Sequence, residues 1–245
     1  MSINKNLLPE IILVNPQLPE NLGAVARAML NFYFKKLRVV NPKFDIKNEK
    51  IIPVSAGAEE IINKIKIFDS FNEAIKDLNY IVATTNRVRS LKKDETNFTK
   101  IAKRLRNKKK NEKIGIVFGP ENSGLDNDHI SLADNFLKIP SNPQFSSLNL
   151  SHAVMVVCYE LIKKIENPEK SLKLKENKKN VSHAKKKELI NFYNILEKKL
   201  ESSNFFLVSE RKKITIQKIR NIFSKSHLKS NEINILIGMI KSLEK

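Results

Sequence analysis

Residues 11–41 read IILVNPQLPENLGAVARAMLNFYFKKLRVVN, and this stretch decides the fold class. IILVN (11–15) is a short run of β-branched and apolar residues that ends at a turn signal, so it predicts a buried strand. NLGAVARAMLNF (21–32) carries apolar residues at helical spacing, and LRVVN (37–41) predicts a second buried strand. A strand, a helix and a second strand in this order predict two parallel strands joined by a helical crossover.

The same alternation continues to residue 165. Further strand-like runs are IKIF (65–68), YIVATT (80–85), KIGIVFG (113–119) and FLKIP (136–140). Helical patterns occur in AGAEEIINKI (56–65), SFNEAIKDL (70–78), NFTKIAKRLR (97–106) and an apolar face from Leu148 to Ile165. The sequence therefore predicts an α/β domain over residues 1–165, with a mostly parallel sheet covered by helices on both faces. Ligand sites of such sheets form in the loops at the carboxyl ends of the strands.

The last third of the chain has a different composition. Residues 166–187 read ENPEKSLKLKENKKNVSHAKKK, a Lys-rich stretch with few apolar residues that is typical of a linker. Helical periodicity returns in residues 189–206, 215–226 and 232–245. We therefore expect a Lys-rich linker over 166–187 and a small α-helical domain over 188–245.

A large positive charge is the strongest compositional signal. The chain carries 45 Lys and Arg residues against 26 acids, a net charge of +19. Residues 165–245 hold 19 basic and 9 acidic residues, so charge is about twice as dense there as before. This surplus indicates a polyanionic partner such as nucleic acid or a membrane surface; a Lys-rich proteome composition is the alternative explanation.

Several classes of protein are disfavoured. No run of 18 apolar residues exists, and MSINKNLLPE lacks the pattern of a signal peptide, so we expect neither a membrane span nor secretion. The single Cys158 lies on an apolar helix face, which favours a packed core thiol and fits a reducing cytoplasm. The four His residues have no partners at metal-ligand spacing, so no metal is predicted. A P-loop and a dinucleotide-binding glycine motif are both missing.

The loop and helix after the first strand contain an unusual glycine and arginine. Asn21 suits the N-cap of the helix. Gly23 in a helix costs about 1 kcal/mol relative to Ala, which suggests that something approaches closely there. Arg27 lies one turn further on the same face and could reach a phosphate or a hydroxyl; a solvated Arg is the alternative.

Two later stretches also follow predicted strands. VFGPENSGLDN (117–127) contains a tight Gly-Pro and Ser-Gly turn, and turn chemistry does not explain its Glu121. QFSSLNLSHA (144–153) precedes the last helix of the domain, and Ser147 is its expected N-cap. A cap does not explain Ser146 and Asn149 beside it, so we interpret this stretch as the wall of a polar site.

Together the three stretches resemble the SpoU/TrmH class of the SPOUT RNA 2′-O-methyltransferases, and within it the TrmJ branch. The matching residues are Asn21, Gly23 and Arg27 in the first motif, Phe118, Gly119, Glu121, Gly124 and Leu125 in the second, and Ser147, Leu148 and Asn149 in the third. LRVVNP, AGA (56–58), NPQFSSLNL (142–150) and the helical tail extend the likeness over almost the whole chain.

This resemblance implies a fold, a cofactor and a substrate. The SPOUT fold has a deep trefoil knot at the C-terminal end of its catalytic domain, and the family forms obligate homodimers with the active site at the subunit interface. The implied cofactor is S-adenosylmethionine, contacted by Thr84, Thr85, Asn86, Gly119, Ile139, Ser146, Ser147 and Leu148. The implied substrate is tRNA, with the cytidine or uridine at position 32 of the anticodon loop as the expected target. Another tRNA or an rRNA ribose, or RNA binding without catalysis, remains the alternative.

The resemblance also assigns catalytic roles. It implies that Arg27 activates the ribose 2′-hydroxyl, but the pKa of an arginine exceeds about 12, so we expect it to stabilise the developing alkoxide or an adjacent phosphate. The residues expected to position Arg27 and the ribose are Asn21, Glu121, Ser147 and Asn149. The helical tail would bind tRNA phosphates in a salt-dependent manner.

The sequence departs from the family pattern at two places. Tyr33 stands where the turn after the first helix usually carries Gly, so that helix is expected to close differently. Asn122 stands where a basic residue is common, which is expected to alter the contact with RNA near Glu121.

Overall fold

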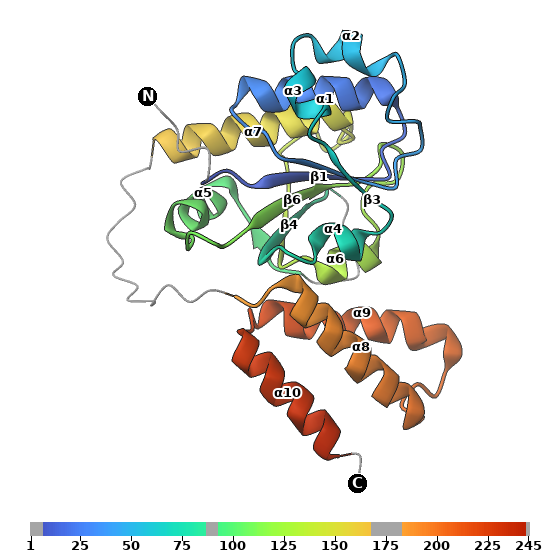
Figure 1. Ribbon diagram of the computed structural model, residues 1–245. Coiled ribbons are helices and arrows are strands. Elements are labelled where there is room, and N and C mark those ends of the chain that lie inside the picture. Colours follow the sequence, from blue (N-terminus) through green and yellow to red (C-terminus); the bar gives the residue numbers. More distant parts are fainter. Residues whose placement is uncertain (1–6, 87–92, 168–182, 244–245) are drawn as a thin grey trace.

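The α/β part of the chain is built on one parallel sheet (Figure 1). The computed structural model describes residues 7–86, 93–167 and 183–243. Its strands are β1 (Glu10–Val14), β2 (Leu37–Val40), β3 (Lys66–Phe68), β4 (Tyr80–Thr84), β5 (Glu95–Thr96), β6 (Ile114–Phe118) and β7 (Asn135–Leu137). They lie in the order β3-β2-β1-β6-β4-β7-β5, and every pair is parallel. The predicted parallel sheet is therefore confirmed.

Two hydrophobic clusters cover the two faces of this sheet. In β1, Ile11 and Leu13 join one cluster while Ile12 and Val14 join the other, because successive side chains of a strand point to opposite faces. Because β1 is buried on both faces, neither face needs polar side chains, and its sequence is therefore a nearly continuous apolar run. Cys158 is fully buried in the first cluster, as predicted, and burial raises the pKa of its thiol.

Helices pack on both sides of the sheet. They are α1 (Pro19–Asn31), α2 (Ile51–Ser55), α3 (Glu59–Ile62), α4 (Phe71–Ile75), α5 (Phe98–Asn107), α6 (Asn127–Leu132) and α7 (Leu150–Glu166). The helix predicted over residues 56–65 is shorter than expected: it is α3, which begins only at Glu59, because Ala56 and Gly57 both adopt positive φ and separate it from α2. The two-residue β5 and the six-residue α6 were not predicted, because elements this short carry no clear periodicity.

The end of α1 is a second correction. Tyr33 adopts a φ of 66°, its N–H donates to the Leu30 carbonyl at 3.2 Å, and the Phe34 N–H donates to the Met29 carbonyl at 3.0 Å. This hydrogen-bond pair is the Schellman motif, which usually places Gly where Tyr33 stands. The helix therefore closes in the usual way although the glycine is missing. Tyr33 adopts a left-handed backbone conformation, which is energetically unfavourable for a residue with a Cβ.

We expect Tyr33→Gly to stabilise the protein by up to about 1 kcal/mol. The substitution removes the cost of about 1–2 kcal/mol that a residue with a Cβ incurs in the left-handed conformation. Part of this gain is offset, because glycine makes the unfolded chain more flexible and so loses more conformational entropy on folding. The Tyr33 side chain is 46 % exposed, so little buried area is lost. Urea unfolding measures the shift, and Tyr33→Ala is the matched control, since it removes the ring and keeps the Cβ. Equal midpoints for the Gly and Ala variants would show that the backbone carries no strain.

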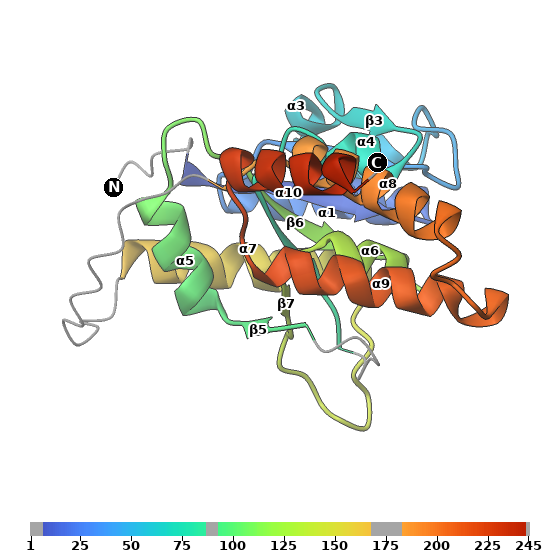
Figure 2. The ribbon, with the colours of Figure 1, turned by 90° about the horizontal axis from the view of Figure 1, so that it is seen from below.

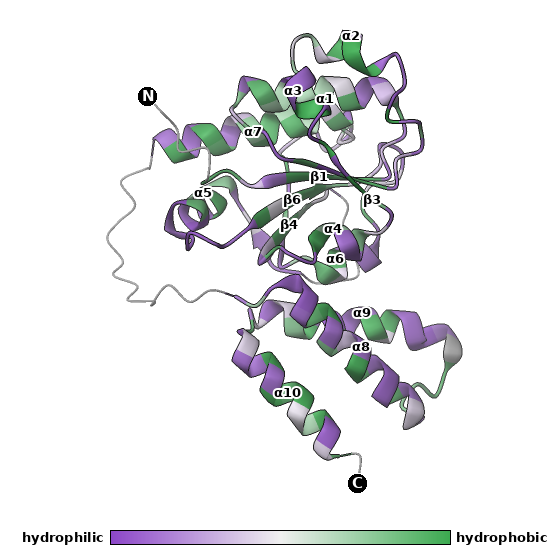
Figure 3. Cartoon of the chain, viewed as in Figure 1, coloured by the Kyte–Doolittle hydropathy of each residue, from purple (hydrophilic) through white to green (hydrophobic). Residues whose placement is uncertain are grey.

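Three further helices pack below α4 and α6 in Figure 1: α8 (Lys186–Ser202), α9 (Ser209–Lys225) and α10 (Ser230–Ser242). Figure 2 shows α8, α9 and α10 from below, with α9 beside α6. The three predicted helices are present, although α9 begins six residues before the predicted range. In Figure 3, hydrophobic colour dominates β1, β6 and β4, whereas α8 and α9 alternate between hydrophilic and hydrophobic segments.

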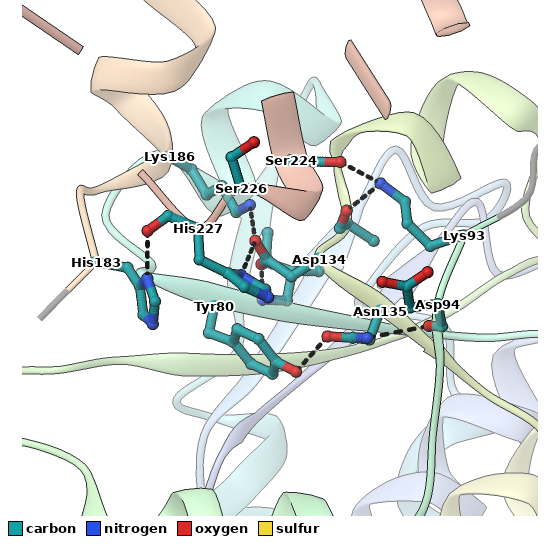
Figure 4. Close-up of polar contacts among 12 residues, drawn as sticks. Tyr80, Lys93, Asp94, Asp134, Asn135, His183, Lys186, Ser224, Ser226 and His227 are labelled. Atoms are coloured by element: carbon teal, nitrogen blue, oxygen red, sulfur yellow. Dashed lines mark hydrogen bonds and ion pairs between the residues drawn. The ribbon is translucent and has the colours of Figure 1, made fainter. Parts of the chain in front are cut away.

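Buried charged groups join these helices to the sheet (Figure 4). The Asp134 carboxylate accepts hydrogen bonds from Lys186 Nζ at 2.8 Å and from the Ile81 N–H at 2.7 Å. Lys93 Nζ donates to Ser224 Oγ and to the Ala133 carbonyl, both at 2.5 Å. We call Lys93, Asp134, Lys186 and Ser224 the polar junction. Each of its members is at most 6 % exposed.

The polar junction includes the end of the expected linker. The Lys186 N–H donates to the Leu78 carbonyl at 2.8 Å, and the Ala184 N–H donates to the Leu228 carbonyl at 3.0 Å. Residues 183–187 thus contact both parts of the protein. Residues 168–182 lie outside the described part of the chain, so a linker over 166–187 stays a prediction.

Candidate active site

A cavity of about 350 Å³ lies at the carboxyl ends of β4, β6 and β7. The residues that line it are Thr84, Thr85, Asn86, Phe118, Gly119, Pro120, Glu121, Asn122, Gly124, Leu125, Ile139, Ser146, Ser147, Leu148, Leu150 and Ala153. All eight residues that the family resemblance assigns to the cofactor are in this set. The cavity also occupies the edge of the sheet at which ligands of open α/β folds bind.

The loop after β6 forms one wall of the cavity. A Cβ on Gly119 would lie 2.2 Å from the Leu125 backbone nitrogen and 2.4 Å from the Gly124 carbonyl carbon, so only glycine fits there. Gly124 adopts a φ of 65°, and its N–H donates to the Pro120 carbonyl at 2.8 Å. Both glycines therefore serve to fold this loop back on itself.

Gly119→Ala is expected to weaken ligand binding in the cavity by at least about tenfold, because the added methyl meets backbone atoms and the wall must shift. Calorimetric titration with S-adenosylmethionine measures the effect. Gly238→Ala is the matched control, since a Cβ there meets nothing within 4 Å. Unchanged affinity in Gly119→Ala would mean that the ligand does not contact this wall.

Glu121 joins the three motif segments next to the cavity. Asn21 Nδ2 donates to Glu121 Oε1 at 2.6 Å, and the Gln17 N–H donates to Glu121 Oε2 at 3.1 Å. Asn149 Nδ2 in turn donates to Asn21 Oδ1 at 2.9 Å. The expectation that Asn21 caps α1 is wrong: the N-cap is Leu18, and the Asn21 side chain is buried between Glu121 and Asn149.

The cap of α7 also differs from the expectation. Asn149 is the N-cap, and its Oδ1 accepts from the Ser151 N–H at 2.9 Å, the Ser151 hydroxyl at 2.7 Å and the His152 N–H at 3.4 Å. Ser147 therefore does not cap the helix. It is exposed and lines the cavity instead, which leaves its hydroxyl near any bound ligand.

Asn86 holds a second part of the cavity wall. Its Nδ2 donates to the Ser146 carbonyl at 3.0 Å and to Ser141 Oγ at 2.9 Å, which ties the segment before α7 to the end of β4. Thr84 Oγ1 donates to the Val117 carbonyl at 2.8 Å and so links β4 to β6. Both side chains position the wall in addition to lining it.

Gly23 and Arg27 lie outside the cavity lining. A Cβ on Gly23 would be 2.2 Å from the Ile51 carbonyl oxygen, so the close approach that Gly23 indicates comes from α2 of the same chain. Arg27 is exposed, and within the described residues its guanidinium has no hydrogen-bond or ion-pair partner. The structure thus brings Asn21, Glu121 and Asn149 together, while Arg27 does not join them.

Asp126 fixes the helix that follows the Glu121 loop. Its carboxylate lies 2.6 Å from His129 Nδ1 and accepts the His129 N–H at 2.9 Å as the N-cap of α6. These interactions with His129 lower the pKa of Asp126 to about 2, so its carboxylate remains ionised at neutral pH. The end of the loop is therefore held by a charged cap.

Sequence reasoning missed part of the site. The missed residues of the cavity are Pro120, Leu150 and Ala153, and the missed donor to Glu121 is the Gln17 N–H. A backbone N–H occurs in almost every residue, so the sequence cannot single out the one at Gln17. The apolar residues of the cavity have the same pattern in the sequence as ordinary core residues.

In the described part of the chain, no cluster of three His, Cys, Asp or Glu side chains could hold a metal ion. No helix within those residues is long and apolar enough to cross a membrane.

Family comparison matches residues 9–159 to the SpoU rRNA Methylase family, and these residues contain the cavity and the Glu121 contacts. The chain belongs to the SpoU methylase family. Residues 187–245 of this SpoU methylase match the C-terminal domain of the tRNA methyltransferase TrmJ. That second match covers α8, α9 and α10 almost completely.

Several proteins similar to this chain carry TrmJ names. The tRNA (cytidine-2′-O-)-methyltransferase TrmJ of Methanocaldococcus jannaschii is 37 % identical, over 71 % of this chain and 76 % of its own. The tRNA (cytidine/uridine-2′-O-)-methyltransferase TrmJ of Yersinia pestis is 31 % identical, over 96 % of this chain and 91 % of its own. The crystal structure of TrmJ from Z. mobilis ZM4 matches with a TM-score of 0.86 and 34 % identity, covering 97 % of this chain and all of that chain.

Proposed function

We propose that this SpoU methylase transfers a methyl group from S-adenosylmethionine to the ribose 2′-hydroxyl of tRNA in the cytoplasm, at the cytidine or uridine in position 32. The observation that carries the proposal is the Glu121–Asn21–Asn149 network, because it assembles three separated motif segments beside one cavity. The names of the relatives support tRNA as the substrate and ribose as the target.

The cavity suits the proposed cofactor. Its volume of about 350 Å³ lies within the range of small-molecule sites, and its lining combines apolar and polar groups. Leu125, Ile139 and Leu150 offer an apolar surface for a purine ring, while Ser146 and Ser147 offer polar groups. When bound, S-adenosylmethionine would supply an electrophilic methyl group on its sulfonium.

The residues of this chain would position the ribose and stabilise its developing negative charge. Glu121 fixes Asn21 and the backbone of Gln17, and Asn21 fixes Asn149, so the floor of the site is held rigidly. Ser147 would hydrogen-bond the ribose from its exposed position. Arg27 would stabilise the alkoxide that forms as the 2′-hydroxyl loses its proton, since its guanidinium remains charged.

Arg27 reaches a reacting ribose only if another surface closes the site, and we propose that a second copy of the chain supplies that surface. Large apolar side chains are exposed around the site: Leu18, Phe145, Leu148, Met155 and Tyr159. A homodimer through α1 and α7, which pack side by side, would bury them. The active site would then contain residues of both subunits.

We also propose that the chain is knotted at this site. The segment after β7 leads from the sheet edge near β5 across the cavity to α7, which packs beside α1. Asn86 holds that segment through the Ser146 carbonyl. This path supports the trefoil knot expected from the SPOUT resemblance.

The proposal predicts two separable activities. Calorimetry should detect S-adenosylmethionine binding to the purified protein, and labelled methyl groups should transfer to unmodified tRNA. A tRNA with 2′-deoxycytidine at position 32 is the matched control and should accept no label. Because the family description names rRNA, ribosomal RNA should be tested in parallel. Tight RNA binding without S-adenosylmethionine binding would contradict the enzyme proposal and favour a non-catalytic RNA-binding protein.

A further inference from the structure

The turn between α8 and α9 is held in one conformation by its own backbone. Asn204 adopts a φ of 55°, its N–H donates to the Glu201 carbonyl at 3.1 Å, and the Phe205 N–H donates to the Leu200 carbonyl at 2.9 Å. This Schellman motif ends α8 and fixes the position of Phe205. The Leu207 N–H donates to the Phe205 carbonyl at 3.2 Å, which closes the turn.

Apolar side chains project from this turn into solvent. Phe205 is 53 % exposed, Leu207 91 % and Val208 49 %. Phe206 is half-buried, and its ring meets the ring of Phe205 edge-on, with 5.4 Å between centroids. A cluster of exposed apolar residues on a fixed turn indicates a contact surface.

Basic residues flank this turn in the sequence, and one of them contacts an aromatic ring. Lys212 Nζ lies 5.8 Å from the centroid of the Phe206 ring, and it also pairs with Glu201. Residues 198–213 contain five basic and two acidic residues, a net charge of +3. Aromatic rings among positive charges are the combination that binds single-stranded nucleic acid, through base stacking and phosphate contacts. Protein interfaces are instead depleted of lysine.

The same turn lies on the cavity side of the molecule. Gln217 Nε2 donates to Asp128 Oδ1 at 2.7 Å, and Lys213 Nζ lies 2.9 Å from Asp128 Oδ2, so the first half of α9 is tied to α6. α6 directly follows the Glu121 loop. Figures 1 and 2 both show the α8–α9 turn at the side toward which β1 and β6 point. An RNA whose ribose enters the cavity can therefore pass over this turn.

We propose that residues 204–208 form a second RNA contact in which Phe205 stacks on an unpaired nucleobase of the substrate, away from the nucleotide in the cavity. The proposal rests on the function proposed above. It assigns part of the RNA affinity to stacking, in addition to phosphate contacts. It also requires a substrate that presents at least two unpaired nucleotides, which a fully paired duplex cannot do.

A tryptophan placed at this position tests the contact directly. The chain has no tryptophan, so Phe205→Trp introduces a single fluorophore that stacking on a base should quench. Unmodified tRNA should quench it, and a blunt RNA duplex should not. Ile235→Trp, at a 61 % exposed position on α10, is the matched control. Equal quenching in both variants, or none in Phe205→Trp while tRNA binds, would overturn the proposal.

Affinity measurements separate stacking from other roles. Phe205→Ala should weaken tRNA binding by about 5- to 150-fold, whereas Phe205→Tyr, which keeps an aromatic ring, should bind tRNA with nearly the wild-type affinity. In Phe205→Ala, the KM for tRNA should rise, while the kcat and the affinity for S-adenosylmethionine stay unchanged.

If the wild-type protein methylates tRNA and Phe205→Ala does so equally well, only this inference fails. If the wild-type protein neither binds nor methylates RNA, the proposed function fails. An altered sedimentation coefficient in Phe205→Ala would assign the turn to a subunit interface and overturn the RNA contact.

Discussion

Arg27→Ala is expected to reduce methyl transfer at least about 100- to 1000-fold while the affinity for S-adenosylmethionine stays unchanged. Arg27 is exposed, lies outside the cavity lining and has no polar partner within the described residues, so its removal disturbs neither the cavity nor the fold. Alanine also favours the helical backbone of α1. The loss should therefore appear in kcat, because the guanidinium acts only as negative charge develops on the ribose oxygen.

Arg27→Lys is the matched control, since it keeps the charge and loses the planar guanidinium. We expect intermediate activity from it. Arg27→Ala with more than about a tenth of wild-type activity would remove Arg27 from the reaction.

Mixed dimers can show which subunit supplies Arg27. Arg27→Ala and Gly119→Ala protein should each be impaired alone. If Arg27 acts on the partner's cavity, co-refolded mixtures should regain activity, because a mixed dimer then contains one intact site. A mixture no more active than its components would place Arg27 in the site of its own subunit.

Asp134→Ala is expected to lower the free energy of unfolding by about 3–5 kcal/mol, because it breaks a buried ion pair. Lys186 would remain 2 % exposed with no carboxylate on its Nζ, and the Ile81 N–H would lose its acceptor. The adjoining cavity measures only about 10 Å³, so it has room for about one water to replace the lost carboxylate. Urea unfolding measures the loss.

The double variant Asp134→Leu/Lys186→Met is the control for this prediction. Replacing both charges with apolar side chains of similar size is expected to recover most of the stability. Asp94→Ala, which removes the exposed ion pair with Lys225, should cost less than about 1 kcal/mol. An Asp134→Ala variant no less stable than Asp94→Ala would show that the polar junction does not hold the helices on the sheet.

The parallel sheet could be predicted from the sequence because its strands are buried on both faces. Ile11, Ile12, Leu13 and Val14 all enter one of the two cores, so the run contains no polar position that could suggest another architecture. The second and third motifs likewise led to the cavity lining, because one follows the carboxyl end of β6 and the other directly precedes α7.

Individual roles of polar residues could not be predicted in the same way. Ser147 and Asn149 both suit an N-cap, and only the backbone at residue 149 decides between them. Asn21 looked like a cap because its partner Glu121 is 100 residues away in sequence. The sequence places Lys186 in a Lys-rich stretch that is typical of a solvated linker. In the structure, its ion pair with the buried Asp134 carboxylate makes it part of the polar junction. Long-range partners of this kind leave no local signal.

The central claim is that the cavity and the Glu121 network serve ribose methylation of tRNA. Mass-spectrometric mapping of tRNA after incubation with the protein and S-adenosylmethionine tests it most directly. We predict a single new methyl group on the ribose of nucleotide 32, absent with Arg27→Ala. A methyl group on a base, or methylation of rRNA fragments with tRNA left unmodified, would contradict the account.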